Sequence, residues 1–343
     1  MTINLDTVDF SKTIVITDLH YGMRNNSKQH NTWCTEFLEF VVARAKELNI
    51  RTLLFLGDWS HNRNNVNIST LNYSHNGMKL LNNSFDNVIM LLGNHDLYFR
   101  DTLELHSIPY AQDFPNIHLI DKITTVKDFC FVPWLVGDDY KKIQTIKQPY
   151  LFCHAEIAKF RMNAHVEMPD HGGLNAEHFQ HQKLVFSGHF HKRQRKGNIC
   201  YIGNAFPHNY ADVFDDDRGL MIWSPGEEPI FEKWPGAPKY RVYNLTEALQ
   251  DPTSLIDNKT FVRITVDCDL TYEDSAFIRE LFETQLNALD VSFIHGRSDG
   301  DDTVLDDSEI NFESVDSIVI SHLNSIESTT MNKQRLIEIY QSI

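Results

Sequence analysis

Three short apolar runs near the N-terminus alternate with segments of helical spacing. The runs cover 13–17, 52–56 and 88–92, and apolar residues recur at helical spacing over about 31–48 and 67–83. A strand–helix–strand–helix–strand order favours parallel strands joined by crossover helices, and the carboxyl ends of such strands meet at one edge of the sheet. The sequence therefore predicts an α/β fold in which the residues just after these strands lie close together.

Polar side chains follow each of the three predicted strands. They are Asp18, His20, Asp58, Asn94, His95 and Asp96. Groups of this kind directly after a buried strand suit the mouth of an active site better than a hydrophobic core. A single His or Asp of this kind is more often structural, and only their convergence points to a site.

The second half of the chain has a different pattern, in which short apolar runs follow one another with little helix between them. Two of these runs, 149–153 and 183–186, also lead into histidines, namely His154 and then His189 and His191. Two sheets packed face to face, with helices outside, would accommodate both halves. We therefore expect a two-sheet α/β/β/α sandwich as the fold class.

A turn-rich stretch at 236–258 indicates a domain boundary. We expect a first domain over 1–250, a small α/β domain over 258–296 and a helical segment over 303–343. The small domain has a strand–helix–strand pattern but too few residues for a generous core of its own. The two amphipathic stretches of the last segment carry more apolar surface than two short helices can bury, which favours binding to a partner.

The composition limits the compartment and the partners. The net charge of −16 repels a polyanion at long range, so a nucleic-acid substrate would require a partner or local basic groups. The five cysteines form no CxxC pair, which is typical of reduced thiols and not of a disulfide framework or a zinc ribbon. No signal-peptide pattern or membrane-length apolar run is present. We expect a cytoplasmic protein that does not contact a membrane.

The polar residues at the predicted strand ends form a set with metal-ligand chemistry. The set is Asp18, His20, Asp58, Asn94, His154, His189 and His191. Mixed oxygen and nitrogen ligands without a thiolate favour a harder divalent ion, such as Mn²⁺ or Fe²⁺, over a structural zinc. The set is too large for one tetrahedral ion, but it suffices for two ions that share a carboxylate. Two ions roughly 3.5–4 Å apart activate a water and clamp the oxygens of a displacement at phosphorus.

The motifs occur in an order that resembles a known superfamily, the calcineurin-like metallophosphoesterases. Asp-x-His, Gly-Asp-x-x-His, Gly-Asn-His-Asp, a lone His and Gly-His-x-His follow one another over about 12–210. The resemblance implies a first metal held by Asp18, His20, Asp58 and His191. It implies a second metal held by Asp58, Asn94, His154 and His189, with Asp58 bridging. From the ligand chemistry above we expect Mn²⁺ as the cofactor. The resemblance also implies that His95 is the general acid or transition-state donor and that Asp96 orients it.

Within the superfamily, the chain most resembles the nuclease subunits of SbcC–SbcD-type complexes, in particular those of T-even-type phages. The segments that suggest this are 18–22, 132–134, 187–191, 201–203 and 217–219. The resemblance implies a DNA exonuclease or endonuclease in recombination, repair or DNA degradation, with the small α/β domain as a cap. It also implies that the helical segment binds an SbcC-like SMC-type ATPase, and it suggests a homodimer. A phage-encoded chain would act in the host cytoplasm.

Several polar residues near the motifs are candidates for supporting roles. His61 stands where the nuclease branch often has Asp or Asn, and it either orients a ligand or belongs to a turn. Lys192, Arg193 and Arg195 directly follow the last ligand, and they either contact substrate phosphates or form a solvated face. His208 lies near the predicted rim, where it either contacts substrate or packs.

Two other functions are compatible with the sequence. A phosphoprotein phosphatase or a cyclic-nucleotide phosphodiesterase would use the same metals, although the small domain and the helical segment argue against this alternative. A non-catalytic scaffold for the ATPase would need no ligands, whereas every ligand and His95 are present. A substrate panel separates the first alternative from a DNA nuclease, and a metal analysis separates the second.

Overall fold

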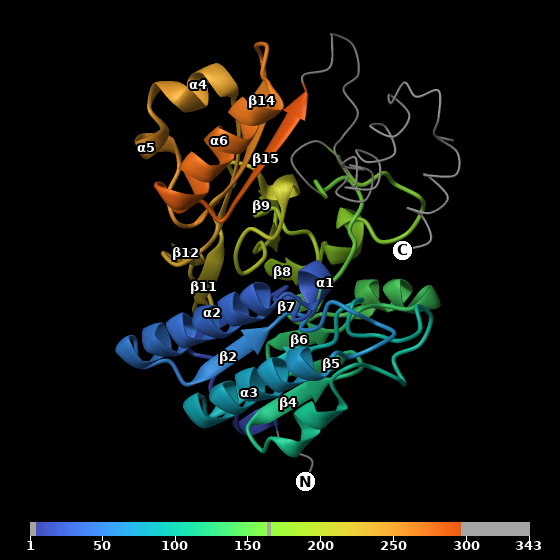
Figure 1. Cartoon of the computed structure of the whole chain (residues 1–343). Helices are drawn as coiled ribbons and strands as arrows, with labels where there is room; N and C mark the ends of the chain where they lie inside the picture. Colours follow the sequence, from blue (N-terminus) through green and yellow to red (C-terminus); the bar gives the residue numbers. More distant parts are fainter. Residues whose placement is uncertain (1–4, 163–165, 296–343) are drawn as a thin grey trace, which may run out of the picture. The chain divides into compact units, whose positions relative to one another are not determined.

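The first of two six-stranded sheets is built mainly from the N-terminal strands (Figure 1). The computed structural model describes residues 5–162 and 166–295, and the order of this sheet is β12-β11-β1-β2-β3-β4. Its strands are β1 (Thr13–Ile16), β2 (Thr52–Phe55), β3 (Asn87–Leu91), β4 (Ile117–Ile120), β11 (Gly219–Trp223) and β12 (Ile230–Lys233). As expected, β1, β2 and β3 run parallel, and β4 extends this parallel part. The strand β11 pairs antiparallel with both β1 and β12.

Two long helices connect the parallel strands and cover one face of this sheet (Figure 1). The helix α2 (Lys28–Glu47) follows the short α1 (Met23–Asn26), and α3 (Ile68–Ser84) lies between β2 and β3. Both begin at a residue whose side chain accepts a hydrogen bond from the first turn, Ser27 for α2 and Asn67 for α3. Apolar side chains of both helices share one core with alternate residues of the strands, as the helical spacing predicts.

The second sheet packs against the other face of the first and has the order β5-β6-β7-β8-β10-β9. Its strands are β5 (Thr124–Val126), β6 (Phe129–Val132), β7 (Tyr150–His154), β8 (Leu184–Gly188), β9 (Gln194–Lys196) and β10 (Ile199–Tyr201). Aromatic rings fill the space between the sheets. For example, the ring centroids of Phe152 and Trp223 lie 5.6 Å apart. The two-sheet sandwich is therefore confirmed as the fold class.

The outer layer of the second sheet consists of 3₁₀ helices and loops rather than long α-helices. The 3₁₀ helices of the described residues are η1 (Leu5–Thr7), η2 (Pro109–Asp113), η3 (Gly137–Thr145), η4 (Ala176–Phe179) and η5 (Tyr210–Asp212). Of these, η3 and η4 contribute Ile143 and Phe179 to the core on this outer face. The short helices agree with the scarcity of helical spacing in this half of the sequence.

A separate three-stranded parallel sheet has the order β13-β14-β15. Its elements are β13 (Lys239–Asn244), α4 (Leu245–Gln250), α5 (Pro252–Leu255), β14 (Thr260–Val266), α6 (Tyr272–Thr284) and β15 (Asp290–His295). These elements share a core of their own. The strand β13 lies in the range 1–250 expected for the first domain, and the division into domains stays a prediction. The helical segment expected at 303–343 lies outside the described residues.

Side chains of the three-stranded sheet contact the region around α1 and α2. The Arg24 guanidinium lies 4.3 Å from the centre of the Phe261 ring, and Trp33 meets the same ring edge-on at 5.8 Å. The Tyr240 hydroxyl donates a hydrogen bond of 2.7 Å to the carbonyl oxygen of His208. The small sheet therefore helps to fix the backbone at His208.

The cysteines all lie in the described part of the chain, and none of them forms a disulfide. Cys34, Cys130, Cys153 and Cys200 are buried, whereas Cys268 is exposed. These positions agree with the expectation of mostly buried thiols. Within 5–162 and 166–295, no helix has both the length and the apolar character needed to cross a bilayer.

Candidate metal centre

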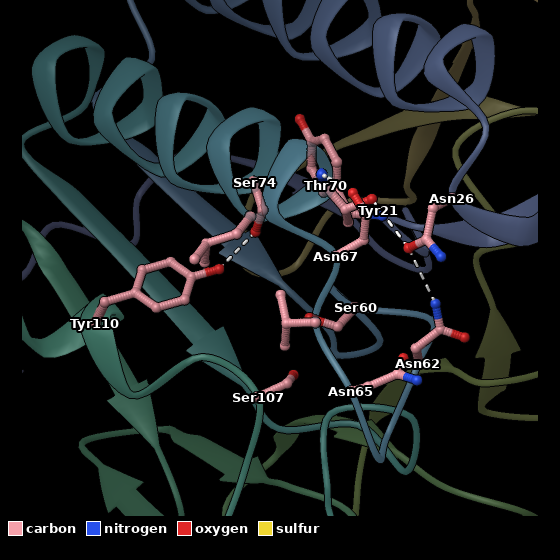
Figure 2. A pocket seen from close by; sticks show the side chains of 12 residues that line it. Tyr21, Asn26, Ser60, Asn62, Asn65, Asn67, Thr70, Ser74, Ser107 and Tyr110 are labelled. Carbon is pink, nitrogen blue, oxygen red and sulfur yellow. Dashed lines mark hydrogen bonds between the residues drawn. The ribbon is translucent and has the colours of Figure 1, made fainter.

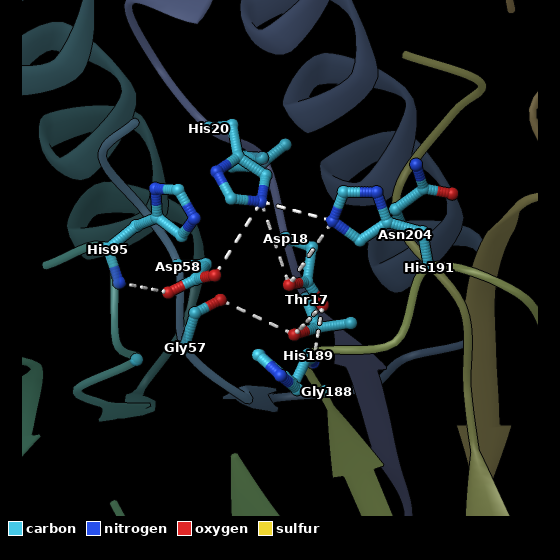
Figure 3. Close-up of polar contacts among 12 residues, drawn as sticks. Thr17, Asp18, His20, Gly57, Asp58, His95, Gly188, His189, His191 and Asn204 are labelled. Atoms are coloured by element: carbon cyan, nitrogen blue, oxygen red, sulfur yellow. Dashed lines mark hydrogen bonds and ion pairs between the residues drawn. The ribbon is translucent and has the colours of Figure 1, made fainter. Parts of the chain in front are cut away.

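Loops at the carboxyl ends of strands from both sheets bring the predicted ligands together. In the first sheet these residues are Asp18 and His20 after β1, Asp58 after β2, and Asn94 after β3. In the second sheet they are His154 at the end of β7 and His189 and His191 after β8. Figure 3 shows Asp18, His20, Asp58 and His191 around a common centre. The convergence expected at the sheet edge is therefore present in the structure.

Several of these residues have a left-handed backbone conformation. The φ angles are 53° at Asp18, 53° at His20, 59° at Asp58 and 91° at His189. Such angles are uncommon for residues other than glycine and persist only where the surrounding structure imposes them. Here the loops impose them on one another, because the Asp18 N–H donates to the Gly57 carbonyl and the His20 N–H donates to the Asp58 carbonyl.

Two glycines allow the loops to approach closely. A Cβ on Gly93 would stand 2.2 Å from Asp58 Oδ1. A Cβ on Gly57, whose φ is +99°, would stand 2.5 Å from His154 Nδ1. A side chain at either position would displace a candidate ligand. The Gly-Asp and Gly-Asn pairs of the sequence therefore combine space for the loop crossing with a candidate ligand in the next residue.

The Asp18 half of the cluster consists of Asp18, His20 and His191. The Nε2 atom of His20 lies 3.2 Å from His191 Nε2, 3.8 Å from Asp18 Oδ1 and 3.6 Å from Asp58 Oδ2 (Figure 3). Asp18 Oδ1 is buried and has no hydrogen-bond partner among the described residues. A buried carboxylate oxygen without a partner, facing imidazole nitrogens, is the arrangement that a bound cation would satisfy.

The Asn94 half consists of Asn94, His154 and His189. His154 Nε2 lies 3.4 Å from Asp58 Oδ2 and 3.0 Å from Asn94 Oδ1, which is also 3.0 Å from His189 Nδ1. The Nδ1–H of His154 donates to the Leu56 carbonyl oxygen at 2.7 Å, so its Nε2 can serve as a ligand. Because Asp58 contacts both halves, the predicted ligands form one cluster around a shared carboxylate.

Burial and mutual charge determine the protonation of the cluster. Burial, followed by the neighbouring imidazoles, holds the pKa of His20 well below its usual value, which leaves its nitrogen able to ligate. Burial also opposes the charged form of His154, but the Asp58 carboxylate outweighs it and raises the pKa of His154 to about 9. His154 in turn outweighs the burial of Asp58 and holds the pKa of that carboxyl well below its usual range. A cation bound at Asp58 would replace the His154 proton.

His95 and Asp96 have partners other than each other. The Nδ1–H of His95 donates to the His61 carbonyl oxygen at 2.8 Å. The Asp96 carboxylate accepts hydrogen bonds from the N–H groups of Gly93 at 2.9 Å and Asp58 at 3.0 Å. Burial, and then the charge of Asp58, raises the pKa of Asp96 to about 7. Asp96 thus joins the loops after β2 and β3, and the His61 carbonyl orients the His95 ring in place of the expected Asp96 side chain.

His61 and His208 lie beside the cluster in different ways. The His61 ring stacks on the His95 ring, with centroids 5.2 Å apart. The His208 ring lies 5.5 Å from that of His20 and 5.2 Å from that of His191, and it has no exposed surface. His208 is therefore buried behind His20 and His191 and not at the rim, which favours packing over substrate contact, the two roles that the sequence left open.

The basic residues after His191 are paired with acidic residues. The ion pairs are Lys192–Asp215 at 3.1 Å, Arg193–Asp217 at 2.9 Å and Arg195–Glu228. Each partner lies more than 20 residues further along the chain, and local sequence gives no sign of it. Because these charges already have counter-charges, the geometry favours a structural role for the run, and its contact with substrate stays a prediction.

Four residues beside the cluster were not predicted as site residues. Glu156 Oε2 lies 3.4 Å from His189 Nε2, and the Trp134 ring lies 5.0 Å from that of His189. Glu156 follows His154, the candidate ligand of β7, by two residues. The pairs after β1 and β8 have the same spacing, and this repeat was the available signal. Arg63 and Arg100 are isolated arginines that no pattern distinguishes.

Two cavities adjoin the cluster. One, of about 410 Å³, is lined by residues that include His95, Arg63 and Arg100. The other, of about 300 Å³, is lined by both arginines together with Asn94 and His189. Together they give a ligand access to His95 and to the Asn94 half.

Comparisons with known proteins agree with this geometry. Residues 11–220 match the model of a family described as calcineurin-like phosphoesterase, which covers more than half of the chain. The chain is also similar to exonuclease subunit 1 of Enterobacteria phage T4, with 23% identity over 95% of this chain and 96% of the other. The superfamily resemblance is thereby confirmed, and the chain belongs to the calcineurin-like phosphoesterase family.

Proposed function

We propose that this phosphoesterase is a DNA nuclease that hydrolyses phosphodiester bonds with the help of two divalent cations. The observation that supports this most is the position of Asp58, whose Oδ2 lies 3.6 Å from His20 Nε2 and 3.4 Å from His154 Nε2. A carboxylate between two imidazole groups is suited to bridge a pair of cations. One cation alone would use only half of the cluster.

The chemistry of the residues fits such a pair. Asp18, His20 and His191 would hold one ion, Asn94, His154 and His189 would hold the other, and Asp58 would be shared. Ligand atoms of Asp18, His20 and Asp58 lie within 4.8 Å of one another, as do those of Asp58, His154 and His189. Oxygen and nitrogen ligands without a thiolate suit Mn²⁺. When bound, the ions supply activation of the attacking water and neutralise charge on the phosphate.

We propose that His95 acts on the leaving group. Its Nδ1–H donates to the His61 carbonyl oxygen, so Nε2 is the nitrogen available to a substrate. From there it can donate a hydrogen bond to a phosphate oxygen or a proton to the departing oxygen. The stacked ring of His61 and the hydrogen bond to its carbonyl restrict rotation of the His95 ring. His61 would therefore be a positioning residue.

DNA as the substrate is supported by the similarity to the phage exonuclease subunit. That similarity covers 95% of the chain, and so it extends past residue 220, where the family match ends. Because the related protein is named as a subunit, we further propose a partner, an SbcC-like SMC-type ATPase bound through 303–343. Such a partner would provide DNA affinity that a chain with a net charge of −16 lacks.

A substrate panel tests the proposed function. The full chain, loaded with Mn²⁺, is given linear duplex DNA, a single-stranded oligonucleotide, bis(p-nitrophenyl) phosphate, a cyclic nucleotide and a phosphopeptide. We expect hydrolysis of DNA and of the small diester, and loss of both in Asp58→Ala. Hydrolysis of phosphopeptide or cyclic nucleotide without DNA would establish the phosphatase or phosphodiesterase alternative. Absence of bound metal and of all hydrolysis would establish the scaffold.

The partner is tested by deletion of 303–343. We expect the shortened chain to retain hydrolysis of the small diester and to lose co-purification with the ATPase. Unchanged co-purification would contradict the assignment of this segment. The mass of the full chain in solution, measured by light scattering, tests the expected homodimer.

A further inference from the structure

Two arginines beside the candidate metal centre differ from the other basic residues near it. Arg63 lies in the loop after β2 and Arg100 in the loop after β3, and both line the two cavities described above. Within the described ranges 5–162 and 166–295, neither forms an ion pair with a carboxylate. By contrast, Lys192, Arg193 and Arg195 are all paired. Among the basic residues near the site, those without an ion pair therefore line the two cavities.

The two guanidinium groups are close enough to affect each other. Burial lowers the pKa of Arg63, and the charge of Arg100 lowers it further. The Asp58 carboxylate acts in the opposite direction but does not offset the lowering, and an anion between the two guanidinium groups would reduce their mutual repulsion. A phosphate suits the position because guanidinium groups donate paired hydrogen bonds to its oxygens.

The loop that carries Arg63 is anchored at its base. Figure 2 shows polar side chains around a cavity of about 10 Å³ between this loop and α3, which is room for about one water. Asn62 Nδ2 donates to the Gly22 carbonyl oxygen and to Asn26 Oδ1, both at 3.3 Å. The side chain of Asn67 caps α3 at the other end of the loop. Arg63 is thus presented by a loop whose two ends are fixed.

Exposed aromatic side chains lie next to Arg100. Tyr98 is 43% exposed and Phe99 is 48% exposed, and their rings meet edge to face at 4.7 Å. Tyr98 lines the larger cavity together with His95. The loop is closed at its base, because the Tyr98 N–H donates to the Leu105 carbonyl at 2.9 Å. Aromatic rings beside arginines are the arrangement that binds unpaired bases and their phosphates.

We infer that Arg63 and Arg100 bind a phosphate adjacent to the scissile one, while Tyr98 stacks on a base of an unpaired strand. This inference rests on the proposed nuclease function and specifies its substrate as a strand rather than a lone phosphodiester. The strand enters along the cavities, with its scissile phosphate at Asn94 and His189 and its next phosphate at the arginines. A small diester reaches the metal ligands but not this second position.

The test compares Arg63→Gln and Arg100→Gln with the matched variant Arg51→Gln. Arg51 precedes β2, at the opposite end of the strand from the site, and its side chain is 64% exposed. We expect KM for a single-stranded oligonucleotide to rise about tenfold in each cavity variant, by much more than KM for bis(p-nitrophenyl) phosphate, and to stay unchanged in Arg51→Gln. The salt dependence of oligonucleotide binding should weaken by about 0.7 in log–log slope per lost contact.

Tyr98→Leu and Tyr98→Phe test the stacking. We expect Tyr98→Leu to weaken oligonucleotide binding about tenfold and Tyr98→Phe to restore it, because stacking needs the ring and not the hydroxyl. Equal losses on the oligonucleotide and the small diester in the arginine variants would overturn the inference and leave the nuclease function standing. A wild-type chain that cleaves phosphopeptide and no DNA would overturn both.

A different observation carries a second proposal, which concerns His208. Its side chain is fully buried, and neither ring nitrogen has a hydrogen-bond partner in the part of the chain that the structure describes. Its backbone is fixed, since its N–H donates to Asp212 Oδ2 at 2.9 Å and its carbonyl accepts from the Tyr240 hydroxyl. An unpartnered buried imidazole is costly and requires a compensating interaction.

The position of this ring supplies a candidate for that interaction. Ligand atoms of His20, His191 and His208 lie within 4.8 Å of one another. We infer that His208 is an additional nitrogen ligand of the cation held by the Asp18 half. This proposal depends on metal binding and not on the choice of DNA as substrate. It makes the Asp18 half richer in imidazole than the family motifs alone imply.

The test replaces His208 by Leu and by Phe, of which the second keeps a flat ring in the buried site. We expect the metal-free melting temperature to stay unchanged or to rise, because unpartnered nitrogens are removed. In equilibrium dialysis, we expect one of two Mn²⁺ ions to bind about tenfold more weakly, with a smaller rise in melting temperature on Mn²⁺ addition. Wild-type Mn²⁺ affinity at both sites in either folded variant would overturn the proposal.

Discussion

The two halves of the candidate metal centre satisfy their polar atoms in different ways. In the Asn94 half, His154 Nδ1 donates to a backbone carbonyl, and His189 Nε2 faces Glu156 at 3.4 Å. In the Asp18 half, Asp18 Oδ1 has no hydrogen-bond partner among the described residues, and the same holds for both ring nitrogens of the adjacent His208. One half is held by groups that would not be ligands. In the other half Asp18 Oδ2 is held by Thr17 and by the His189 N–H, but the remaining buried polar atoms would be satisfied only by a bound cation.

This difference bears on how metal binding and folding are coupled. Imidazoles whose second nitrogen is hydrogen-bonded keep their tautomer and orientation before any metal arrives. Buried polar atoms without partners raise the free energy of the metal-free fold, and a cation that satisfies them stabilises it. We therefore expect the Asp18 half to contribute more to stabilisation by metal, and the Asn94 half to be better ordered without it.

The largest effect on metal binding and hydrolysis is expected from the loss of Asp58, which contacts both halves. Asp58→Ala removes the carboxylate that contacts both halves, so both ions should be lost together and hydrolysis should fall by about a thousandfold or more. Mn²⁺ content by mass spectrometry and hydrolysis of a small diester measure this. Retention of one tightly bound ion would show that the halves do not depend on a common residue.

A substitution outside both halves gives the next largest effect. In His95→Asn we expect hydrolysis to fall by about 10²–10⁴-fold, because the donor to the leaving oxygen is lost. Both ions should remain, since His95 is not among the proposed ligands. Equilibrium dialysis with Mn²⁺ distinguishes the two effects, and a variant that loses metal along with activity would place His95 among the ligands.

Glu156→Gln tests the support of the Asn94 half alone. Loss of the carboxylate beside His189 should lower the affinity for one of the two Mn²⁺ ions by about 10–100-fold and leave the affinity for the other unchanged. Glu177→Gln is the matched control, because Glu177 is exposed and lies on η4, away from the cluster. An equal loss of affinity for both ions would contradict the distinction between the halves.

The smallest expected effect is a pH dependence of the free energy of unfolding, and it exists only in the metal-free protein. The pKa of His154 rises from 6.5 to about 9 on folding, since Asp58 outweighs the burial that opposes it. A group whose pKa is raised in the folded state contributes its full share to the free energy of unfolding below pH 6.5. This contribution is lost as the pH rises to about 9. Urea unfolding should therefore show that His154→Gln costs more stability at pH 6 than at pH 9. An equal cost at both values would contradict the pairing.

Sequence reasoning located the proposed ligands because each one stands at a strand end. Apolar runs mark the strands, and parallel order brings Asp18, Asp58 and Asn94 to one edge whatever the details of the loops. The contacts between loops were not predictable in this way. That Asp96 binds the backbone of the neighbouring loop, and that His61 rather than Asp96 orients His95, depends on three-dimensional crossings that spacing does not encode.

Which basic residues near the site have no ion pair was harder to predict than which residues are candidate metal ligands. The run that begins at Lys192 is conspicuous in the sequence, but its partners around Asp215 become neighbours only in the folded chain. Arg63 and Arg100 stand alone in the sequence, yet they share both cavities. Similarly, β13 pairs parallel with β14, and parallel pairing leaves no local pattern that would assign it to the small sheet.

The hydrogen bonds of Asp96 have a consequence for mutational scanning. Its buried carboxylate accepts hydrogen bonds from the N–H groups of Gly93 and Asp58, so its loss would shift the loops after β2 and β3 at once. A scan scored on activity will rank Asp96 with the proposed ligands. A parallel scan scored on the amount of folded, metal-free protein will separate them, because loss of Asp96 should disturb the fold, whereas loss of a proposed ligand such as His191 should leave it intact.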